Sequence, residues 1–124
     1  MDIKFGDIMK VDFGVTTGSI QGKIRPCVVV QNDIGNKYSP TTIVIPLTSA
    51  IKKANMPVHD ILYKSTRNGL KSNSLILGEQ VRVIDKSMIL SKLGSLTDEE
   101  CDKVISVYIR NVPRKNRRVA NYEA

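Results

Sequence analysis

Two short runs of apolar, largely β-branched residues most constrain what this chain can fold into. Residues 27–30 read Cys-Val-Val-Val and residues 41–47 read Thr-Thr-Ile-Val-Ile-Pro-Leu, with the turn-forming segment 32–36 between them. A strand that is covered on both faces needs no polar side chain on either face, so such runs favour buried strands over helices. The pattern predicts two central strands joined by a turn.

Further segments complete a set of short strands. Residues 8–13 alternate apolar and polar side chains, as expected for a half-buried strand, and a polar connection over 14–23, longer than a tight hairpin, follows them. Residues 58–63, 74–84 and about 88–93 read as further strands, and Gly78 predicts a bulge or a sharp bend in the long one. Together these segments predict a small, strongly curved, barrel-like sheet.

One helix is predicted near the C-terminus. Thr97 and Glu100 form a capping-box pattern, and acidic residues occupy the first turn. Apolar residues then recur at helical spacing and predict one stripe that packs on the sheet: Cys101, Val104, Ile105, Tyr108 and Val112. Pro113 is expected to end the helix. The fold class is therefore mainly β with helices (α+β), a curved barrel with a C-terminal helix packed on it.

Length and charge set the organisation and the class of partner. The 124 residues predict one domain over 1–112, followed by a basic, poorly apolar tail over 113–124 that is expected to be disordered. The net charge of +7 suits a polyanionic partner such as nucleic acid. The sequence has no signal-peptide pattern and no stretch of membrane-spanning length, so a cytoplasmic location is expected. Cys27 and Cys101 lie in apolar runs and are predicted to be buried free thiols.

Arg25 stands at the junction between the polar connection and the first apolar run. Pro26 fixes its own φ and biases Arg25 toward extended geometry, so the guanidinium is held by a rigid neighbour. This arrangement is typical of an anion-binding arginine. The alternative is a structural ion-pair partner.

The residue inventory excludes several kinds of chemistry. The single histidine rules out a two-histidine ribonuclease mechanism within one subunit, and the sequence has no phosphate-binding loop for nucleoside triphosphates. Its acidic residues stand mostly at turns or at the helix start, where capping explains them, so neither a metal site nor a cofactor is expected.

Several motifs, in order, resemble those of the MazF/PemK toxin family over residues 5–112. They are Gly6-Asp7-Ile8, Arg25-Pro26-Cys27-Val28-Val29-Val30-Gln31-Asn32, Ser39-Pro40-Thr41, Pro46-Leu47-Thr48-Ser49 and Glu79-Gln80-Val81-Arg82-Val83-Ile84-Asp85-Lys86. The resemblance implies a metal-independent, sequence-specific endoribonuclease (mRNA interferase) on an SH3-like or CcdB-like barrel, acting as a homodimer and neutralised by a MazE-type antitoxin. It also implies attack by the ribose 2′-hydroxyl, with 2′,3′-cyclic phosphate and 5′-hydroxyl products.

The family's catalytic arginine and threonine correspond to Arg25 and Thr48. A guanidinium can donate two parallel hydrogen bonds to the phosphorane oxygens, and the hydroxyl can supply a third. Arginine holds its proton too tightly to act as an easy general base, so the base stays open. Thr48 has an alternative reading as a hydroxyl that caps a strand end or turn.

Further RNA contacts are expected from polar side chains and one glycine, since such groups read the edges of unstacked bases. They are Thr17, Ser19, Gln21, Gly22, Asn32, Ser49, His59, Glu79 and Gln80. Ile20 and Ile24 stand where many family members have an acid and a basic residue, so the contacts of this loop differ from the family pattern. Two other functions stay open: a CcdB-like toxin that poisons a protein target such as DNA gyrase without catalysis, and a simple RNA-binding module.

Overall fold

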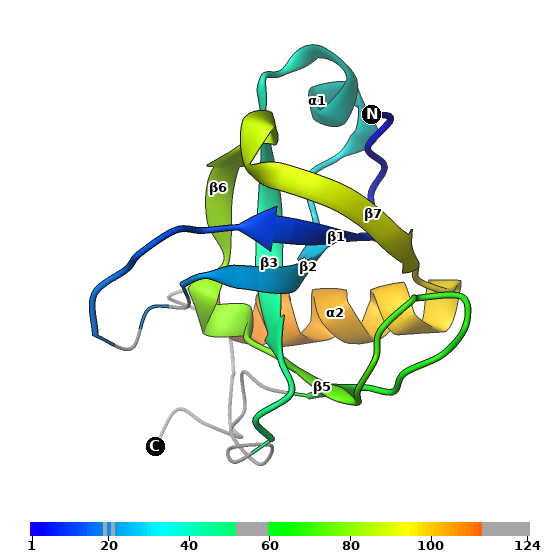
Figure 1. The fold of residues 1–124 in the computed structure, drawn as a ribbon. Coiled ribbons are helices and arrows are strands. Elements are labelled where there is room, and N and C mark those ends of the chain that lie inside the picture. The colour runs from blue at the N-terminus through cyan, green and yellow to red at the C-terminus, as the bar shows by residue number, and fades with distance from the viewer. Residues whose placement is uncertain (19, 21, 52–59, 113–124) are drawn as a thin grey trace.

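The computed structural model describes residues 1–18, 20, 22–51 and 60–112. In this part of the chain a curled antiparallel sheet is accompanied by two α-helices and two short 3-10 turns (Figure 1). The elements are β1 (Asp7–Asp12), β2 (Ile24–Val29), α1 (Asp33–Tyr38), β3 (Thr41–Thr48), β4 (Ile61–Leu62), β5 (Ser74–Ile76), η1 (Gly78–Gln80), β6 (Arg82–Asp85), η2 (Lys86–Met88), β7 (Ile89–Ser95) and α2 (Asp98–Arg110).

The strand β3 is the centre of the sheet. The strand order is β4-β5-β3-β2-β1-β7, and β6 also pairs with β3. Ile45 lies opposite Val28 of β2, while the two ends of β3 pair with β6 and β5 on its other side. Figure 1 shows the sheet curling, with β7 crossing in front of β1 and α2 running along one side. The predicted fold class, mainly β with a C-terminal helix on a curved sheet, is confirmed.

The core has two parts because successive residues of a strand point to opposite faces. Ile8 and Met9 are both fully buried, one on each face. The cluster on the α2 side contains Ile8, Val28, Ile45, Leu47, Leu62, Leu70, Ile76, Leu96, Val104 and Val107. The opposite cluster contains Ile3, Met9, Val11, Phe13, Cys27, Val29, Val44 and Ile84. The apolar runs of β2 and β3 are therefore covered on both faces, as predicted.

The long strand expected over 74–84 is interrupted at Gly78. Between the pairs Leu47–Ile76 and Val44–Arg82, β3 has two residues and the facing chain has five. The three extra residues match the length of η1, which Gly78 begins. The interruption was predicted, but it is a helical turn rather than a simple bulge, and the segment forms two strands, β5 and β6.

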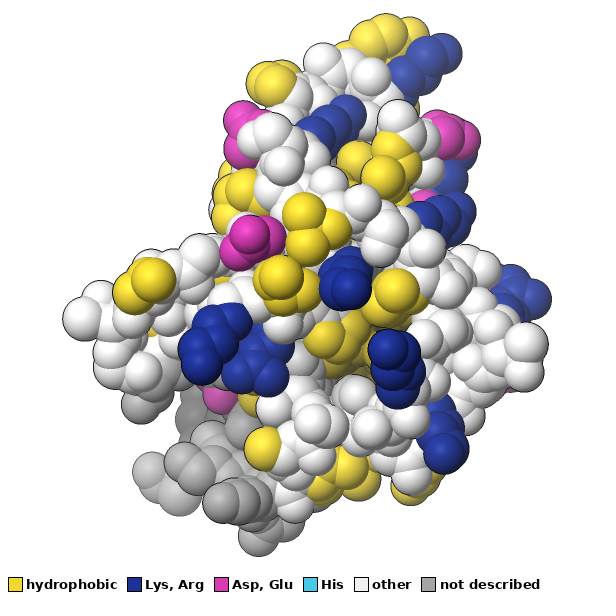
Figure 2. All heavy atoms as spheres, in the orientation of Figure 1, with side chains coloured by type: hydrophobic (Ala, Val, Ile, Leu, Met, Phe, Trp, Pro, Cys, Tyr) yellow, Lys and Arg dark blue, Asp and Glu magenta, His cyan; other side chains and the backbone are white. Residues whose placement is uncertain are grey.

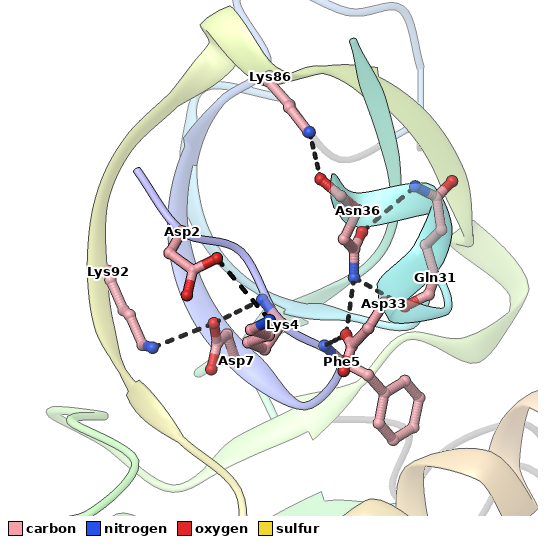
Figure 3. A network of polar contacts seen from close by, with 9 residues as sticks. All are labelled: Asp2, Lys4, Phe5, Asp7, Gln31, Asp33, Asn36, Lys86 and Lys92. Carbon is pink, nitrogen blue, oxygen red and sulfur yellow. Dashed lines mark hydrogen bonds and ion pairs between the residues drawn. The ribbon is translucent and has the colours of Figure 1, made fainter. Parts of the chain in front are cut away.

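The segment 32–36, expected to be a turn, begins the short helix α1. The Asn32 side chain caps it by accepting a hydrogen bond from the Gly35 N–H at 2.8 Å. Asn36, only 3% exposed, lies at the centre of a polar network that Figure 3 shows. The Asn36 side-chain amide donates to the Gln31 carbonyl at 2.9 Å, and the Lys86 ammonium donates to the main-chain carbonyl of Asn36. These tertiary bonds hold a helix that is too short to be stable alone.

The helix α2 begins after Thr97 with the predicted capping box, in which the Glu100 N–H donates to Thr97 Oγ1 at 3.2 Å. Its buried residues are Val104 and Val107. The predicted stripe is wrong in part, because Val107, which does not belong to it, is buried and three of its members are exposed. Its exposed members are Ile105, Tyr108 and Val112.

The two cysteines are free thiols, as predicted. Cys27 is buried, whereas Cys101 is only half-buried. Among the described residues, no helix is long and apolar enough to span a membrane.

Candidate functional site

Arg25 is the second residue of β2 and is half-buried. The hairpin loop before it closes through two backbone bonds, from Phe13 N–H to the Lys23 carbonyl at 2.8 Å and from Lys23 N–H to the Gly14 carbonyl at 2.7 Å. Arg25 Nε then donates to the Gly22 carbonyl at 3.3 Å. The backbone of Arg25 is thus held by the strand, and its side chain is held by the loop. The sequence predicted only one constraint on Arg25, that from Pro26.

Two cavities meet at Arg25. One has a volume of about 290 Å³ and is lined by Lys10, Ile24, Arg25, Pro26, Leu47, Ser49, Gly69, Leu70, Lys71, Ser72, Ser74 and Leu93. The other has a volume of about 370 Å³ and is lined by the hairpin loop, namely Gly14, Val15, Thr16, Gly18, Ile20, Gly22, Lys23 and Arg25. The guanidinium therefore stands where a ligand lying across both cavities would pass.

Thr48 is the last residue of β3 and is half-buried. Cys27 and Pro46 form the last β2–β3 pair on this side, and Arg25 and Thr48 each lie two residues beyond it, at the same end of the two strands. Thr48 Oγ1 accepts a hydrogen bond from the Ala50 N–H at 3.2 Å, so the hydroxyl also shapes the turn after β3. An accepting hydroxyl keeps its own proton available for donation.

The other predicted RNA-contact residues lie in different parts of the structure. Ser49 and Gly22 each line a cavity that contains Arg25, and Thr17 is an exposed residue of the hairpin loop. Ser19, Gln21 and His59 lie outside the described residues.

Glu79 and Gln80 belong to η1, not to a strand as expected. η1 packs against β3 and α2, and neither residue lines the two cavities beside Arg25. Asn32 lies three residues beyond the far end of β2, and the strand from Arg25 to Val29 already spans about 13 Å at about 3.3 Å per residue. Its side chain caps α1. The structure therefore brings Arg25 together with the region around Thr48, but not with Asn32.

Sequence reasoning missed two lysines of the first cavity. Lys10 was predicted only as the polar side of a half-buried strand, and Lys71 lies in a segment that showed no motif. Cross-strand register supplies the missing signal for Lys10, because it lies directly opposite Pro26, the residue next to Arg25. For Lys71 the sequence offers no comparable signal.

Charge around the site is mainly positive. Figure 2 shows Lys and Arg side chains across the middle of the face that carries β1 and β2, interspersed with hydrophobic side chains.

Burial raises the pKa of the Cys27 thiol, and the nearby Arg82 charge opposes this shift. In the described part of the chain, no group of three or more His, Cys, Asp or Glu residues is arranged to hold a metal ion.

Comparison with known proteins gives a family, and the similar proteins include two endoribonucleases. Residues 4–110 match the family described as PemK-like, MazF-like toxin of type II toxin-antitoxin system. The chain is 45% identical to the endoribonuclease EndoA of Bacillus subtilis over 104 residues, covering 84% of this chain and 89% of that protein. It is 46% identical to the endoribonuclease MazF of Staphylococcus saprophyticus over 99 residues, covering 80% and 82%.

Solved structures share the fold. MazF from Deinococcus radiodurans superposes with a TM-score of 0.73 at 20% identity, covering 87% of this chain and 94% of that one. A mycobacterial endoribonuclease in complex with its cognate antitoxin superposes with a TM-score of 0.72 at 16% identity, covering 90% and 98%.

Proposed function

The chain belongs to the PemK-like, MazF-like toxin family of type II toxin–antitoxin systems, and we propose that it is an endoribonuclease that cleaves single-stranded mRNA at a site centred on Arg25. The observation that carries this proposal is the position of Arg25, which is fixed by the Gly22 carbonyl and lines both cavities. The relatives named as endoribonucleases match most of this chain, which supports the same activity here.

The proposed reaction is a metal-independent transesterification. The ribose 2′-oxygen forms a bond to the adjacent phosphorus, and the bond from phosphorus to the 5′-oxygen breaks. One proton leaves the 2′-hydroxyl and one reaches the 5′-oxygen, so the products are a 2′,3′-cyclic phosphate and a 5′-hydroxyl. Negative charge develops on the phosphorane oxygens, where Arg25 and Thr48 donate hydrogen bonds. The remaining predicted contacts would read the bases around the cut and give sequence specificity.

The proposed partners follow from the family and the charge. A type II toxin is paired with an antitoxin, here of the MazE type, and a net charge of +7 favours an acidic binding segment. We expect a homodimer that acts in the cytoplasm, where mRNA is available, and arrests growth by cutting it.

The test is cleavage of a long single-stranded RNA by the purified chain in excess EDTA. Cyclic-phosphate and 5′-hydroxyl ends, identified by their response to kinase and phosphatase treatment, support the proposal. Intact RNA, or cleavage that appears only with added metal, contradicts it. Sequencing the 5′ ends of the products gives the recognition sequence in the same experiment.

Matched arginine variants locate the site. We expect Arg25→Ala to lower the cleavage rate by about 10²–10³ and Thr48→Ala by about tenfold or more. Arg25→Lys should not restore the rate, because a point charge lacks the guanidinium fork. Arg110→Ala is the control, since Arg110 lies on α2, where it forms a 4.0 Å ion pair with Asp60, and lines neither cavity. If Arg25→Ala folds and cleaves at the normal rate, the site is elsewhere.

A further inference from the structure

The first cavity beside Arg25 combines an apolar floor with a cationic rim. Leu47, Leu70 and Leu93 contribute apolar surface from three separate parts of the chain, and Ile24 and Pro26 extend it along β2. Lys10 and Lys71 stand on the rim with Arg25, and Ser49, Ser72 and Ser74 supply hydroxyls. With a volume of about 290 Å³, the cavity is at the small end of the range for ligand sites, about 300–1,000 Å³.

Lys10 owes its position to the register between β1 and β2. Ile8 opposite Val28 is the preceding pair on the same face, and both residues are buried in the α2-side core. The next pair on that face is Lys10 opposite Pro26, where the core ends and the cavity begins. A lysine here can lay its alkyl stem on the apolar floor and keep its ammonium at the rim.

Lys71 is placed by a loop built around a buried side chain. Asn68 is fully buried, and its Oδ1 accepts from the N–H groups of Ser65 and Leu70 at 3.0 Å each. Its amide donates to the Tyr63 carbonyl at 2.9 Å and to Glu100 Oε2 at 3.2 Å. The loop is therefore anchored to α2, and Lys71 follows Leu70, whose side chain is 8% exposed.

Neither lysine has an ion-pair partner within the described residues. Two such ammonium groups, placed with Arg25 around one apolar cavity, suit a ligand that alternates phosphates with flat apolar rings. We infer that Lys10 and Lys71 bind the backbone phosphates that flank the one held by Arg25, and that one of the two bases between these flanking phosphates lies on the apolar floor. This inference rests on the proposed function, because it extends the RNA path at the same site.

The test measures RNA affinity against salt concentration for Lys10→Met and Lys71→Met. Methionine keeps most of the stem and removes the charge. The probe is a fluorescent, mixed-sequence single-stranded RNA with 2′-O-methyl riboses, which cannot be cleaved by 2′-oxygen attack. A lysine that binds one phosphate adds about 0.7 to the slope of log affinity against log salt, so its replacement should lower the slope by that amount. Lys37→Met is the control, because it makes the same change in net charge on α1, at the other end of β2.

We expect each cavity variant to bind the probe about three- to tenfold more weakly, with the lower slope, and Lys37→Met to match the unmodified chain. Unchanged slopes in both cavity variants overturn the inference. It is also overturned if they keep RNA affinity but lose affinity for poly-glutamate, since the cavity then belongs to an acidic protein segment. The EDTA cleavage assay on the unmodified chain separates these results from failure of the proposed function, because it uses neither lysine variant.

Discussion

Arg25 and Gly22 are joined by a hydrogen bond from the guanidinium Nε to the Gly22 carbonyl oxygen, 3.3 Å away. Nε lies on the side edge of the guanidinium, whereas Nη1 and Nη2 form the terminal fork that recognises phosphate in bidentate fashion. The loop thus positions the guanidinium through Nε and leaves the terminal fork of Nη1 and Nη2 for a ligand. The geometry of the hairpin loop is thereby coupled to the geometry of the site.

Gly22→Ala tests this coupling. A Cβ at Gly22 would lie 2.5 Å from Thr16 Oγ1 and 3.2 Å from the Gly14 carbonyl, so the loop must shift and the carbonyl that holds Arg25 moves with it. We expect the cleavage rate to fall about tenfold or more, since small displacements at a reacting centre are costly. Gly18→Ala strains the same loop at a φ of +60° but meets nothing within 4 Å, so it should keep more activity. Equal rates for the two variants would contradict the coupling.

Gly69→Ala and Gly14→Ala form a second matched pair, measured by thermal or urea unfolding. Both glycines have a positive φ, +69° and +67°. A Cβ at Gly69 would lie 2.1 Å from the Leu93 carbonyl oxygen, whereas a Cβ at Gly14 meets nothing within 4 Å. We expect about 1–2 kcal/mol of destabilisation from the backbone alone at Gly14 and about 1–3 kcal/mol more at Gly69. A smaller loss at Gly69 than at Gly14 would show that the loop is not packed against β7 as described.

Asn36 and Thr42 should be strongly coupled. Thr42 is fully buried, and its hydroxyl donates to Asn36 Oδ1 at 2.6 Å. Asn36→Ala removes this acceptor and should lower the free energy of unfolding by about 2–3 kcal/mol, because it leaves buried polar groups unpaired. In the double variant Asn36→Ala with Thr42→Val, the free energy of unfolding should fall by less than the sum of the two single losses. Valine has no hydroxyl, so no unpaired Thr42 hydroxyl remains in the core. Strictly additive losses in the double-mutant cycle would rule out a direct interaction.

Asp33 makes stability depend on pH. Its carboxylate accepts from the Phe5 N–H at 2.6 Å, which lowers its pKa below the ordinary 3.8, and the Asn36 amide acts in the same direction (Figure 3). The unfolded chain therefore binds this proton more readily than the folded chain. The stabilisation is fully present above 3.8 and is lost as the pH falls through the lower folded pKa.

The measurement is urea unfolding from about pH 5 to about pH 2.5, a range that spans the titration of an ordinary carboxyl. Asp33→Asn keeps an oxygen that can accept the Phe5 bond but does not titrate here, so its stability should fall less steeply with acid. Asp2→Asn, at a side chain that is 84% exposed, is the charge-matched control. The same slope in Asp33→Asn and in the unmodified chain would contradict the assignment.

The strands could be predicted where their burial requires a recognisable run of apolar residues in the sequence. The runs around Val28 and Val44 are apolar on both faces because both faces are covered. The capping box at Thr97 is also a local pattern, and α2 begins where it indicates.

The sequence was ambiguous where tertiary contacts choose between local alternatives. Val107 is buried, whereas Ile105 and Tyr108 are exposed, because the apolar part of α2 is wider than the part that faces the sheet. α1 depends on the bonds of Asn36, and six residues are too few to show helical periodicity. The cavity lysines, Lys10 and Lys71, are brought together by strand register and loop anchoring, which no local pattern encodes.

Cys27 lies two residues after Arg25, yet it is fully buried and burial raises the pKa of its thiol. Only the thiolate reacts readily with peroxides and disulfides, so this sulfur is protected both by its protonation state and by lack of access. The strand that carries Arg25 therefore offers oxidants no reactive thiol among its residues. We expect the candidate site at Arg25 to have no thiol switch on this strand.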